Sequence, residues 1–390
     1  MAAERPSMPP LGHIIIGNRD QVLLAYFDGT QFVIASRLII PNWMPASILF
    51  KPPNILYAAN KLSSDTNMLR LGYRDMGGDS SAEPDGNRPR FDEISFGANG
   101  IGSYGGRHLA FNTDRTRMVE CSHITGEIDV WDISREDNAP RLMKTLWALG
   151  NADPTRAQLP GPREAILDPI GRYFVIANAG NRTLSLLDTR DDRYEIVGIR
   201  DIPDGIIPGT MAFVIIRETP YLLLVGGVES AIALVRMNYT DTGPQFGTVQ
   251  FGRSSGQSSD DEPSMSAFAG IVVASNQRDI YIWNRFSQER SGHIAHFTIT
   301  DDTDPPRIVF AENTPTAGIQ PRWVSLSSDT NQEFALVAND LGSTGIAAFR
   351  RDPATGRLDP NPAATLPTHL LATWGLPETV IKGPQVVFEI

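Results

Sequence analysis

The sequence predicts an all-β protein, a seven-bladed β-propeller, from three observations. One pattern recurs seven times along the 390 residues: a Pro- or Gly-containing turn, an apolar strand, a second turn, and an apolar strand ending in a small residue followed by Asn or His. Four short strands per unit at this spacing are typical of propeller blades. Helical periodicity is nearly absent, whereas Gly and Pro, which many tight turns require, number 34 and 29.

The repeats begin near positions 45, 106, 162, 210, 265, 321 and 377, so successive units lie 48 to 61 residues apart. The first is MPASILFKPPNILYAAN (44–60), and the third is GPREAILDPIGRYFVIAN (161–178). Most copies continue into a third strand, and a weaker fourth strand follows in several. We therefore expect antiparallel, four-stranded blades.

The two ends of the chain carry incomplete units. The last copy, 376–390, stops after two predicted strands, and the N-terminal segments 13–18, 21–28 and 31–39 are strands that belong to no complete copy. Pairing the two ends would remove exposed sheet edges. We therefore expect N- and C-terminal strands to close the last blade of a single domain over 1–390.

Three segments of low hydrophobicity lie outside the predicted strands. We expect 1–12 to be a flexible N-terminal segment, and 78–102 and 251–264 to be loop inserts. Long loops on one rim of a rigid scaffold can serve as lids over a site.

The composition excludes several classes of partner. A formal net charge of −11 and a pI near 5.1 argue against nucleic acid and against anionic membrane surfaces. No apolar run approaches the length of a membrane span. Cys121 is the only cysteine, so no internal disulfide can form, and we expect it to be buried in a strand. A small-molecule substrate is the expected partner, and the oligomeric state stays open.

The compartment also stays open. The opening MAAERPSMPPLGH lacks the apolar core of a secretion signal, so we expect a cytoplasmic protein or one secreted after a signal has been removed. Two sequons, at Asn181 and Asn238, would be candidates for N-glycosylation in a secreted chain.

The central channel of a propeller is lined by the first strand of each blade. At the predicted starts of these strands lie Ala46, Arg107, Arg163, Met211, Phe268, Arg322 and Glu378. The ends of the second strands return to the same face, and they bring Arg19, Asn60, His123, Asn178, Arg285 and Asn339. An acidic protein thus gathers arginines and amides at one axial opening, which favours binding of a carboxylate, an enolate or a polarised carbonyl.

Four of these residues are the expected catalytic set: Arg285, Arg322, His123 and Asn339. The two arginines and the amide would donate hydrogen bonds to a substrate oxygen, and His123 is the histidine best placed for proton transfer. The alternatives are structural, with each arginine tying two blades together and His123 holding a turn.

Apolar residues are expected to complete the substrate pocket, namely Met211, Phe268, Trp283 and Trp323. We expect neither a metal nor an organic cofactor. His293 and His296 lie three apart on a strand, so they point to opposite faces and make a poor metal pair.

The repeats resemble the seven-bladed lactonase superfamily, which includes bacterial-type 6-phosphogluconolactonases and fungal carboxy-cis,cis-muconate cyclases. The resemblance is best in 162–188, in DIYIWNRFSQERSGHIAHFTI (279–299) and in 318–358. It implies that Arg285 and Arg322 occupy family positions.

The chain also departs from the family pattern. Pro162-Arg163 stands where the family usually has Pro-His, Asn178-Ala179-Gly180 replaces a DLG, and PGTMAF replaces a GPRH segment at 208–213. These losses favour a branch that resembles fungal hetero-Diels–Alderases of specialised metabolism, enzymes that form a ring from a small apolar unsaturated substrate. The alternatives are a lactone hydrolase or muconate-type cyclase and, third, a non-enzymatic scaffold.

Overall fold

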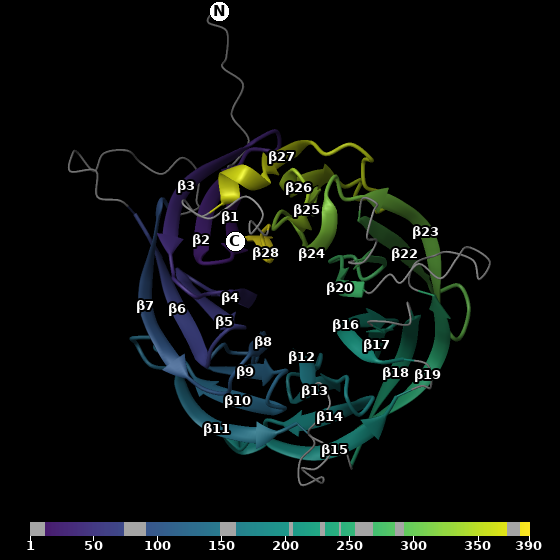
Figure 1. Ribbon diagram of the computed structural model, residues 1–390. Helices are drawn as coiled ribbons and strands as arrows, with labels where there is room; N and C mark the ends of the chain where they lie inside the picture. Colours follow the sequence, from purple (N-terminus) through teal and green to yellow (C-terminus); the bar gives the residue numbers. More distant parts are fainter. Residues whose placement is uncertain are drawn as a thin grey trace, which may run out of the picture.

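The computed structural model describes residues 12–73, 91–148, 161–202, 206–226, 231–241, 243–253, 268–284, 292–372 and 383–390. Their strands form seven four-stranded antiparallel sheets arranged as blades around a central axis (Figure 1). The helical elements within these ranges are the short 3-10 helices η2 (Arg190–Asp192) and η3 (Thr368–Leu371). The predicted all-β, seven-bladed propeller is confirmed.

The strands of each blade are given from the axis outward. Blade 1 consists of β28 (Val386–Glu389), β1 (Gly12–Asn18), β2 (Gln21–Phe27) and β3 (Phe32–Ile39), and blade 2 consists of β4 (Pro45–Lys51), β5 (Ile55–Asn60), β6 (Asp65–Gly72) and β7 (Glu93–Ile101). Blade 3 consists of β8 (Gly106–Phe111), β9 (Arg117–Ser122), β10 (Glu127–Asp132) and β11 (Arg141–Trp147), and blade 4 consists of β12 (Pro162–Leu167), β13 (Tyr173–Asn178), β14 (Thr183–Asp188) and β15 (Glu195–Asp201).

Blade 5 consists of β16 (Pro208–Ile216), β17 (Thr219–Gly226), β18 (Ala231–Thr240) and β19 (Gly243–Arg253). Blade 6 consists of β20 (Phe268–Val273), β21 (Asp279–Asn284), β22 (His293–Thr300) and β23 (Arg307–Pro315). Blade 7 consists of β24 (Ile319–Leu326), β25 (Phe334–Leu341), β26 (Thr344–Arg350) and β27 (Ala364–Pro367).

The ring closes through blade 1, where the two ends of the chain meet (Figure 1). β28 pairs antiparallel with β1, with Val386 opposite Gly17, and Val386 and Val387 are fully buried. The closure by both termini is confirmed, with one difference in detail. Within the described residues the C-terminal segment supplies one strand, the innermost, and the N-terminal segment supplies three.

The segment 78–102, expected to be a loop insert, contains a strand. β7 pairs with β6 over eight residue pairs, from Gly72 opposite Glu93 to Asp65 opposite Ile101. An outer strand needs apolar side chains on one face only, so β7 can contain several glycines and small residues and still form. This composition gives a weak hydrophobic pattern in the sequence. In the insert expected at 251–264, residues 251–253 belong to β19 and the rest lies outside the described residues.

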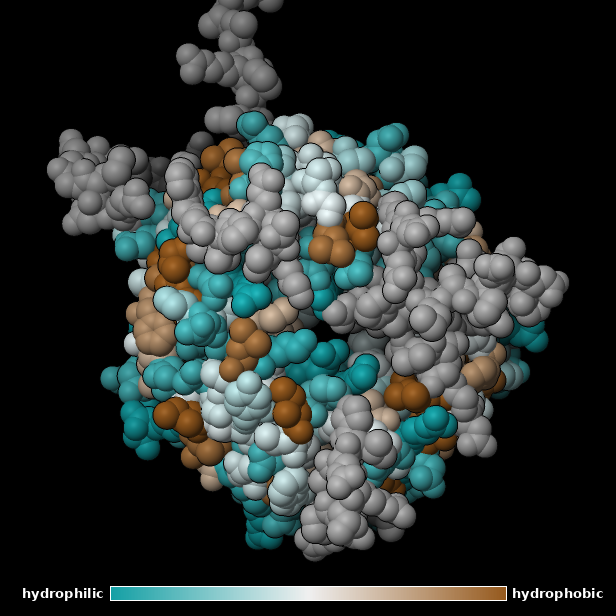
Figure 2. Space-filling model, in the orientation of Figure 1, coloured by the Kyte–Doolittle hydropathy of each residue, from teal (hydrophilic) through white to brown (hydrophobic). Residues whose placement is uncertain are grey.

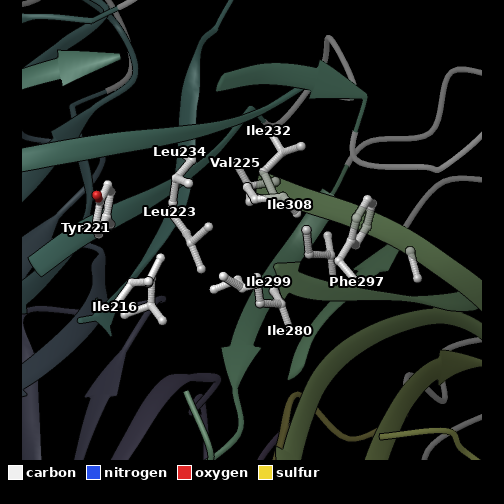
Figure 3. Packing of buried hydrophobic residues seen from close by; sticks show 13 residues of the cluster. Ile216, Tyr221, Leu223, Val225, Ile232, Leu234, Ile280, Phe297, Ile299 and Ile308 are labelled. Carbon is white, nitrogen blue, oxygen red and sulfur yellow. The ribbon is translucent and has the colours of Figure 1, made fainter. Parts of the chain in front are cut away.

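The hydrophobic core lies between the blades. The second strands β5, β13 and β21 are buried at every position, because neighbouring blades cover both of their faces, whereas the outer strand β15 alternates between exposed and partly buried residues. Figure 3 shows one such layer, in which Leu223 of blade 5 packs with Ile280 and Phe297 of blade 6. Cys121 is fully buried in β9, as expected.

No helix in the described ranges has the length and apolar character needed to cross a membrane.

Candidate active site at the mouth of the channel

A β-bulge recurs at the start of the inner strand in six blades. In each, the pairing of the first and second strands skips one residue of the first strand, and the skipped residues are Ala46, Arg107, Arg163, Gly209, Ala269 and Arg322. A bulge leaves its extra residue outside the ladder and redirects its side chain. Three arginines therefore occupy equivalent positions at one end of the channel, which we call the mouth.

Blade 1 fills this position with Gln385. The backbone N–H of Gln385 donates to the carbonyl of Gly17 (2.8 Å), directly before β28 begins. The segment Gly383-Pro384-Gln385 matches the Gly161-Pro162-Arg163 of blade 4. The sequence prediction placed Glu378 here instead, and Glu378 lies outside the described residues.

Arg107 is one of the cations at the mouth, and it lies at the bulge of blade 3. Its side chain is partly buried, and among the residues that the structure describes it makes no hydrogen bond and no ion pair. Burial, followed by the nearby charges of Arg163 and Arg322, lowers the pKa of Arg107 to about 10, while Glu164 acts in the opposite direction. The site therefore holds several positive charges in a protein whose net charge is −11.

A second set of polar residues lies at or directly after the ends of the second strands: Arg19, Lys61, His123 and Asp340. Arg19 lies 3.6 Å (Nε to Oδ2) from Asp20. With the bulge arginines, this set makes the mouth predominantly cationic. Figure 2 shows hydrophilic residues around the hollow at the centre of the ring.

His123 lies among these cations. Its Nδ1 is 3.4 Å from the carbonyl oxygen of Gly161. Burial, and then the charges of Arg107 and Arg163, lower the pKa of His123 to about 4. The imidazole is therefore neutral at pH 7 and can accept a proton.

Arg322 has a different environment from Arg107. Its Nε donates to Oδ2 of Asp340 (2.9 Å), and its Nη2 contacts the same oxygen. Oδ1 of Asp340 accepts a hydrogen bond from Nε2 of Gln385 (3.1 Å). This buried triad compensates the charge of Arg322 and connects blade 7 to the closing strand, so it fits the structural alternative for this arginine.

In blades 2, 3 and 4 the residue after the bulge contacts the neighbouring inner strand. The N–H of Leu109 donates to Oγ of Ser47 (3.3 Å), and the N–H of Met211 donates to Oε2 of Glu164 (2.7 Å). His108 of blade 3 lies 3.6 Å (Nε2 to Oε1) from the same Glu164. Burial raises the pKa of Glu164 to about 7. These contacts fix the ring in which the bulge arginines sit.

The asparagines at the ends of the second strands hold local turns. Oδ1 of Asn60 accepts the N–H of Met44 (3.1 Å), and Nδ2 of Asn339 donates to the carbonyl of Thr316 (3.1 Å). Nδ2 of Asn178 donates to a buried serine of its own blade, at 2.7 Å. All three side chains are buried, so these donors serve the rim of the mouth rather than a ligand.

Two members of the expected apolar wall, Met211 and Trp283, lie in the core rather than at the mouth. Met211 is buried between blades 4 and 5, and Trp283 is buried between blades 6 and 7. Trp323 is partly buried against blades 1 and 2. β16 begins at Pro208, two residues before the predicted start, so Gly209 takes the bulge position expected for Met211.

Two predicted residues, Arg285 and Glu378, lie outside the described residues, as does the side chain of Phe268. Sequence reasoning missed Lys61, Glu164 and Gln385. For Gln385 the sequence offered one clue, which was the match between Gly-Pro-Arg at 161–163 and Gly-Pro-Gln at 383–385. Within the described ranges, no group of three or more His, Cys, Asp and Glu side chains could hold a metal ion.

The family model described as "Lactonase, 7-bladed beta-propeller" matches residues 52–369. The chain belongs to this lactonase family. No match was found among the curated proteins.

Solved structures share the fold of this lactonase-family chain. A protein from Lactobacillus plantarum is 16% identical, with a TM-score of 0.73 and coverage of 98% of this chain and 100% of its own. The periplasmic gluconolactonase of Pseudomonas aeruginosa is 13% identical, with a TM-score of 0.73 and coverage of 98% and 99%. A putative 6-phosphogluconolactonase from Bacteroides uniformis is 16% identical, with a TM-score of 0.70 and coverage of 97% and 99%.

The arrangement in this lactonase-family protein suits one kind of chemistry. Arg107 can pair with an anion, a second arginine can polarise a carbonyl, and the neutral His123 can accept a proton. All three groups reach the mouth from blades 3 and 4.

Proposed function

We propose that this lactonase-family protein hydrolyses a small anionic lactone at the mouth of the channel. Arg107 carries the proposal, because its partly buried guanidinium has no hydrogen bond or ion pair within the described residues. A buried charge that lacks a partner is costly, and a ligand carboxylate would compensate it through two parallel hydrogen bonds. Arg163, at the same position of the next blade, adds a second cation.

In the proposed reaction His123 is the general base. The Gly161 carbonyl can only accept, so Nδ1 carries the proton and Nε2 keeps its lone pair. Nε2 takes a proton from the water that attacks the lactone carbonyl carbon, and an arginine stabilises the oxyanion that forms. As the ring C–O bond breaks, the imidazolium returns the proton to the leaving ring oxygen. The product is an open-chain hydroxy acid.

Hydrolysis is better supported than cycloaddition. The prediction of a ring-forming catalyst depended on an apolar cup at the mouth, and two of its expected members, Met211 and Trp283, are buried in the core. The family is named for lactonases, and a neighbour of similar fold is described as a gluconolactonase. A non-enzymatic scaffold predicts no turnover of any lactone, so a lactone assay separates it from hydrolysis.

The test is proton release measured by titration at constant pH. The substrates are a lactone of an aldaric acid, which keeps a free carboxylate, and neutral gluconolactone. We expect kcat/KM to be higher for the charged lactone. Arg107→Met should lower kcat/KM about 10- to 100-fold for the charged lactone and much less for the neutral one, because it removes an ion pair worth about 1.5–3 kcal/mol. His123→Gln should lower kcat for both by about 10²–10⁴-fold.

Arg236→Met serves as the matched control, because Arg236 is an exposed arginine near the middle of β18, away from the mouth. It should leave both rates unchanged. Equal turnover of the two lactones with no effect of Arg107→Met would remove the anion site from the proposal. A folded protein that hydrolyses neither lactone would contradict the proposed hydrolysis and favour the scaffold or the ring-forming alternative.

A further inference from the structure

Exposed apolar side chains gather at the mouth end of blades 2 and 3. Five of them, with exposed fractions of 40 to 72%, form what we call the apolar shelf: Leu62, Ile101, Tyr104, Ile124 and Trp147. They lie in the turns after β5 and β9, in the loop before β8, and at the ends of the outer strands β7 and β11. All of these positions are at the end of the blades where the bulge arginines lie.

The shelf is continuous. The N–H of Gly105, directly after the shelf tyrosine, donates to the carbonyl of Ser63 (3.0 Å), which brings the loop before β8 onto the turn after β5. A Cβ placed on Gly105 would lie 2.7 Å from Cδ1 of Ile124, so the isoleucine covers this glycine. A Cβ on Gly126 would lie 3.7 Å from the ring of Trp147. The turns of two blades and the outer strand of blade 3 thus form one apolar surface.

The shelf is a local feature of the rim. At the last paired residue of the outer strand, blades 2 and 3 have Ile101 and Trp147. Blades 4, 5 and 6 have Asp201, Arg253 and Pro315 at the same register. Blade 1 also has an isoleucine there, so at this register apolar side chains run over blades 1 to 3 and stop at blade 4. Blade 7, on the other side of blade 1, has Pro367 there. Exposed apolar groups concentrated in this way mark binding surfaces.

We infer that the substrate is amphipathic, with an anionic lactone head at the mouth and an apolar tail across the shelf. This inference rests on the function proposed above. His123 and Ile124 are consecutive residues, so a ligand head at the histidine reaches the shelf directly. The tail would run outward over blade 3, from β8 to β11, which is about 14 Å at the usual spacing of adjacent strands.

The chemistry of the surface favours a tail over a macromolecular partner. A stable protein–protein interface covers about 800 Å² of each partner. Five partly exposed side chains offer a surface of the size that one alkyl or prenyl chain covers. The surface also adjoins a cationic mouth, and a ligand with an anionic head and an apolar tail complements both parts. Burying that tail provides the hydrophobic gain.

The test uses linear alkanoates, which contain no lactone to hydrolyse, as binding probes. They are titrated into the protein and followed by calorimetry at one pH and ionic strength. Butanoate reports on the mouth alone, and octanoate and dodecanoate report on the mouth and the shelf. We expect dodecanoate to bind about 10- to 100-fold more tightly than butanoate. The double variant Ile124→Ser/Trp147→Ser should abolish this chain-length dependence and leave butanoate binding unchanged.

Ile170→Ser is the matched control, because Ile170 is 58% exposed, like Ile124, and lies in the turn between β12 and β13, away from the mouth. It should keep the full chain-length dependence. If affinity is independent of chain length while butanoate binding still requires Arg107, the shelf inference is overturned and the anion site stands. If no alkanoate binds and Arg107→Met does not change kcat/KM for the charged lactone, the proposed function fails as well. A variant whose circular dichroism differs from wild type is replaced by Ile124→Thr with Trp147→Gln.

Discussion

Arg107 and Arg322 occupy the same bulge position in different blades, yet their surroundings differ. Arg322 is held by a nearly fully buried carboxylate, Asp340, which a glutamine of the closing strand also contacts. Arg107 lacks such a carboxylate within 4 Å among the described residues. From sequence position alone the two arginines would be expected to act alike. The presence of a carboxylate beside Arg322 distinguishes its environment from that of Arg107.

Replacing each arginine by Met should therefore give opposite results. Arg322→Met leaves Asp340 buried without its counter-charge, and it should lower the free energy of unfolding by about 3–5 kcal/mol. Arg107→Met removes a charge that has no ion pair within the described residues, and it should leave that free energy unchanged or raise it, while lowering turnover of a charged lactone. Denaturant unfolding and lactone titration on the same preparations measure both effects. A stable Arg322→Met protein with reduced turnover would instead make Arg322 a substrate-binding residue.

The inner strand β20 shows how one element accommodates its neighbour. Gly270 lies opposite Trp283 in the pairing of β20 with β21, and the indole occupies the space where a side chain at position 270 would lie. Glu164 of blade 4 and Trp323 of blade 7 have side chains at the equivalent position after the bulge. The glycine of blade 6 therefore permits a tryptophan to fill the layer between blades 6 and 7.

Gly270→Ala should be destabilising, because the added methyl group would overlap the Trp283 ring. Overpacking of this kind costs about 1–3 kcal/mol. Gly247→Ala is the control, since Gly247 is also a strand glycine and a Cβ there meets no atom within 4 Å. Denaturant midpoints should fall for Gly270→Ala and hold or rise for Gly247→Ala. Equal midpoints would mean that the indole moves without cost.

The electrostatics of the mouth belong to the whole ring. Lys61 comes from blade 2, His123 and Arg107 from blade 3, and Arg163 from blade 4, so the charges that lower the pKa of His123 meet only when the blades assemble. The same is true of the buried contact between Asp340 and Gln385, which joins blade 7 to the C-terminal strand.

The assembled mouth predicts the pH dependence of lactone hydrolysis. His123 must be unprotonated to act as a base, so kcat/KM should rise with pH through about 4. Arg107 must be protonated to bind the anion, so kcat/KM should fall through about 10. Arg163→Met removes one of the charges that lower the pKa of His123, and it should move the acid limb upward, toward the ordinary value of 6.5. Rates are corrected for uncatalysed hydrolysis at each pH. An acid limb that stays in place in Arg163→Met would exclude His123 as the titrating base.

The sequence by itself determined the architecture, because a propeller repeats one local unit. Seven copies of a turn-strand-turn-strand pattern were enough to predict the blades, their antiparallel strands and the closure by both termini. The outer strand β7 was missed because a strand with one face toward solvent carries a weak hydrophobic pattern.

Only the tertiary structure decided the site. Arg107, Arg163 and His123 were predicted to lie at the mouth because they stand at the predicted ends of strands, and the structure brings them together there. The bulge that aims the arginines, the ion pair that occupies Arg322 and the burial of Met211 and Trp283 were not readable there. The physical reason is that a one-residue change in strand register moves a side chain from the channel to the core, and the partner of a charge comes from a strand far along the chain.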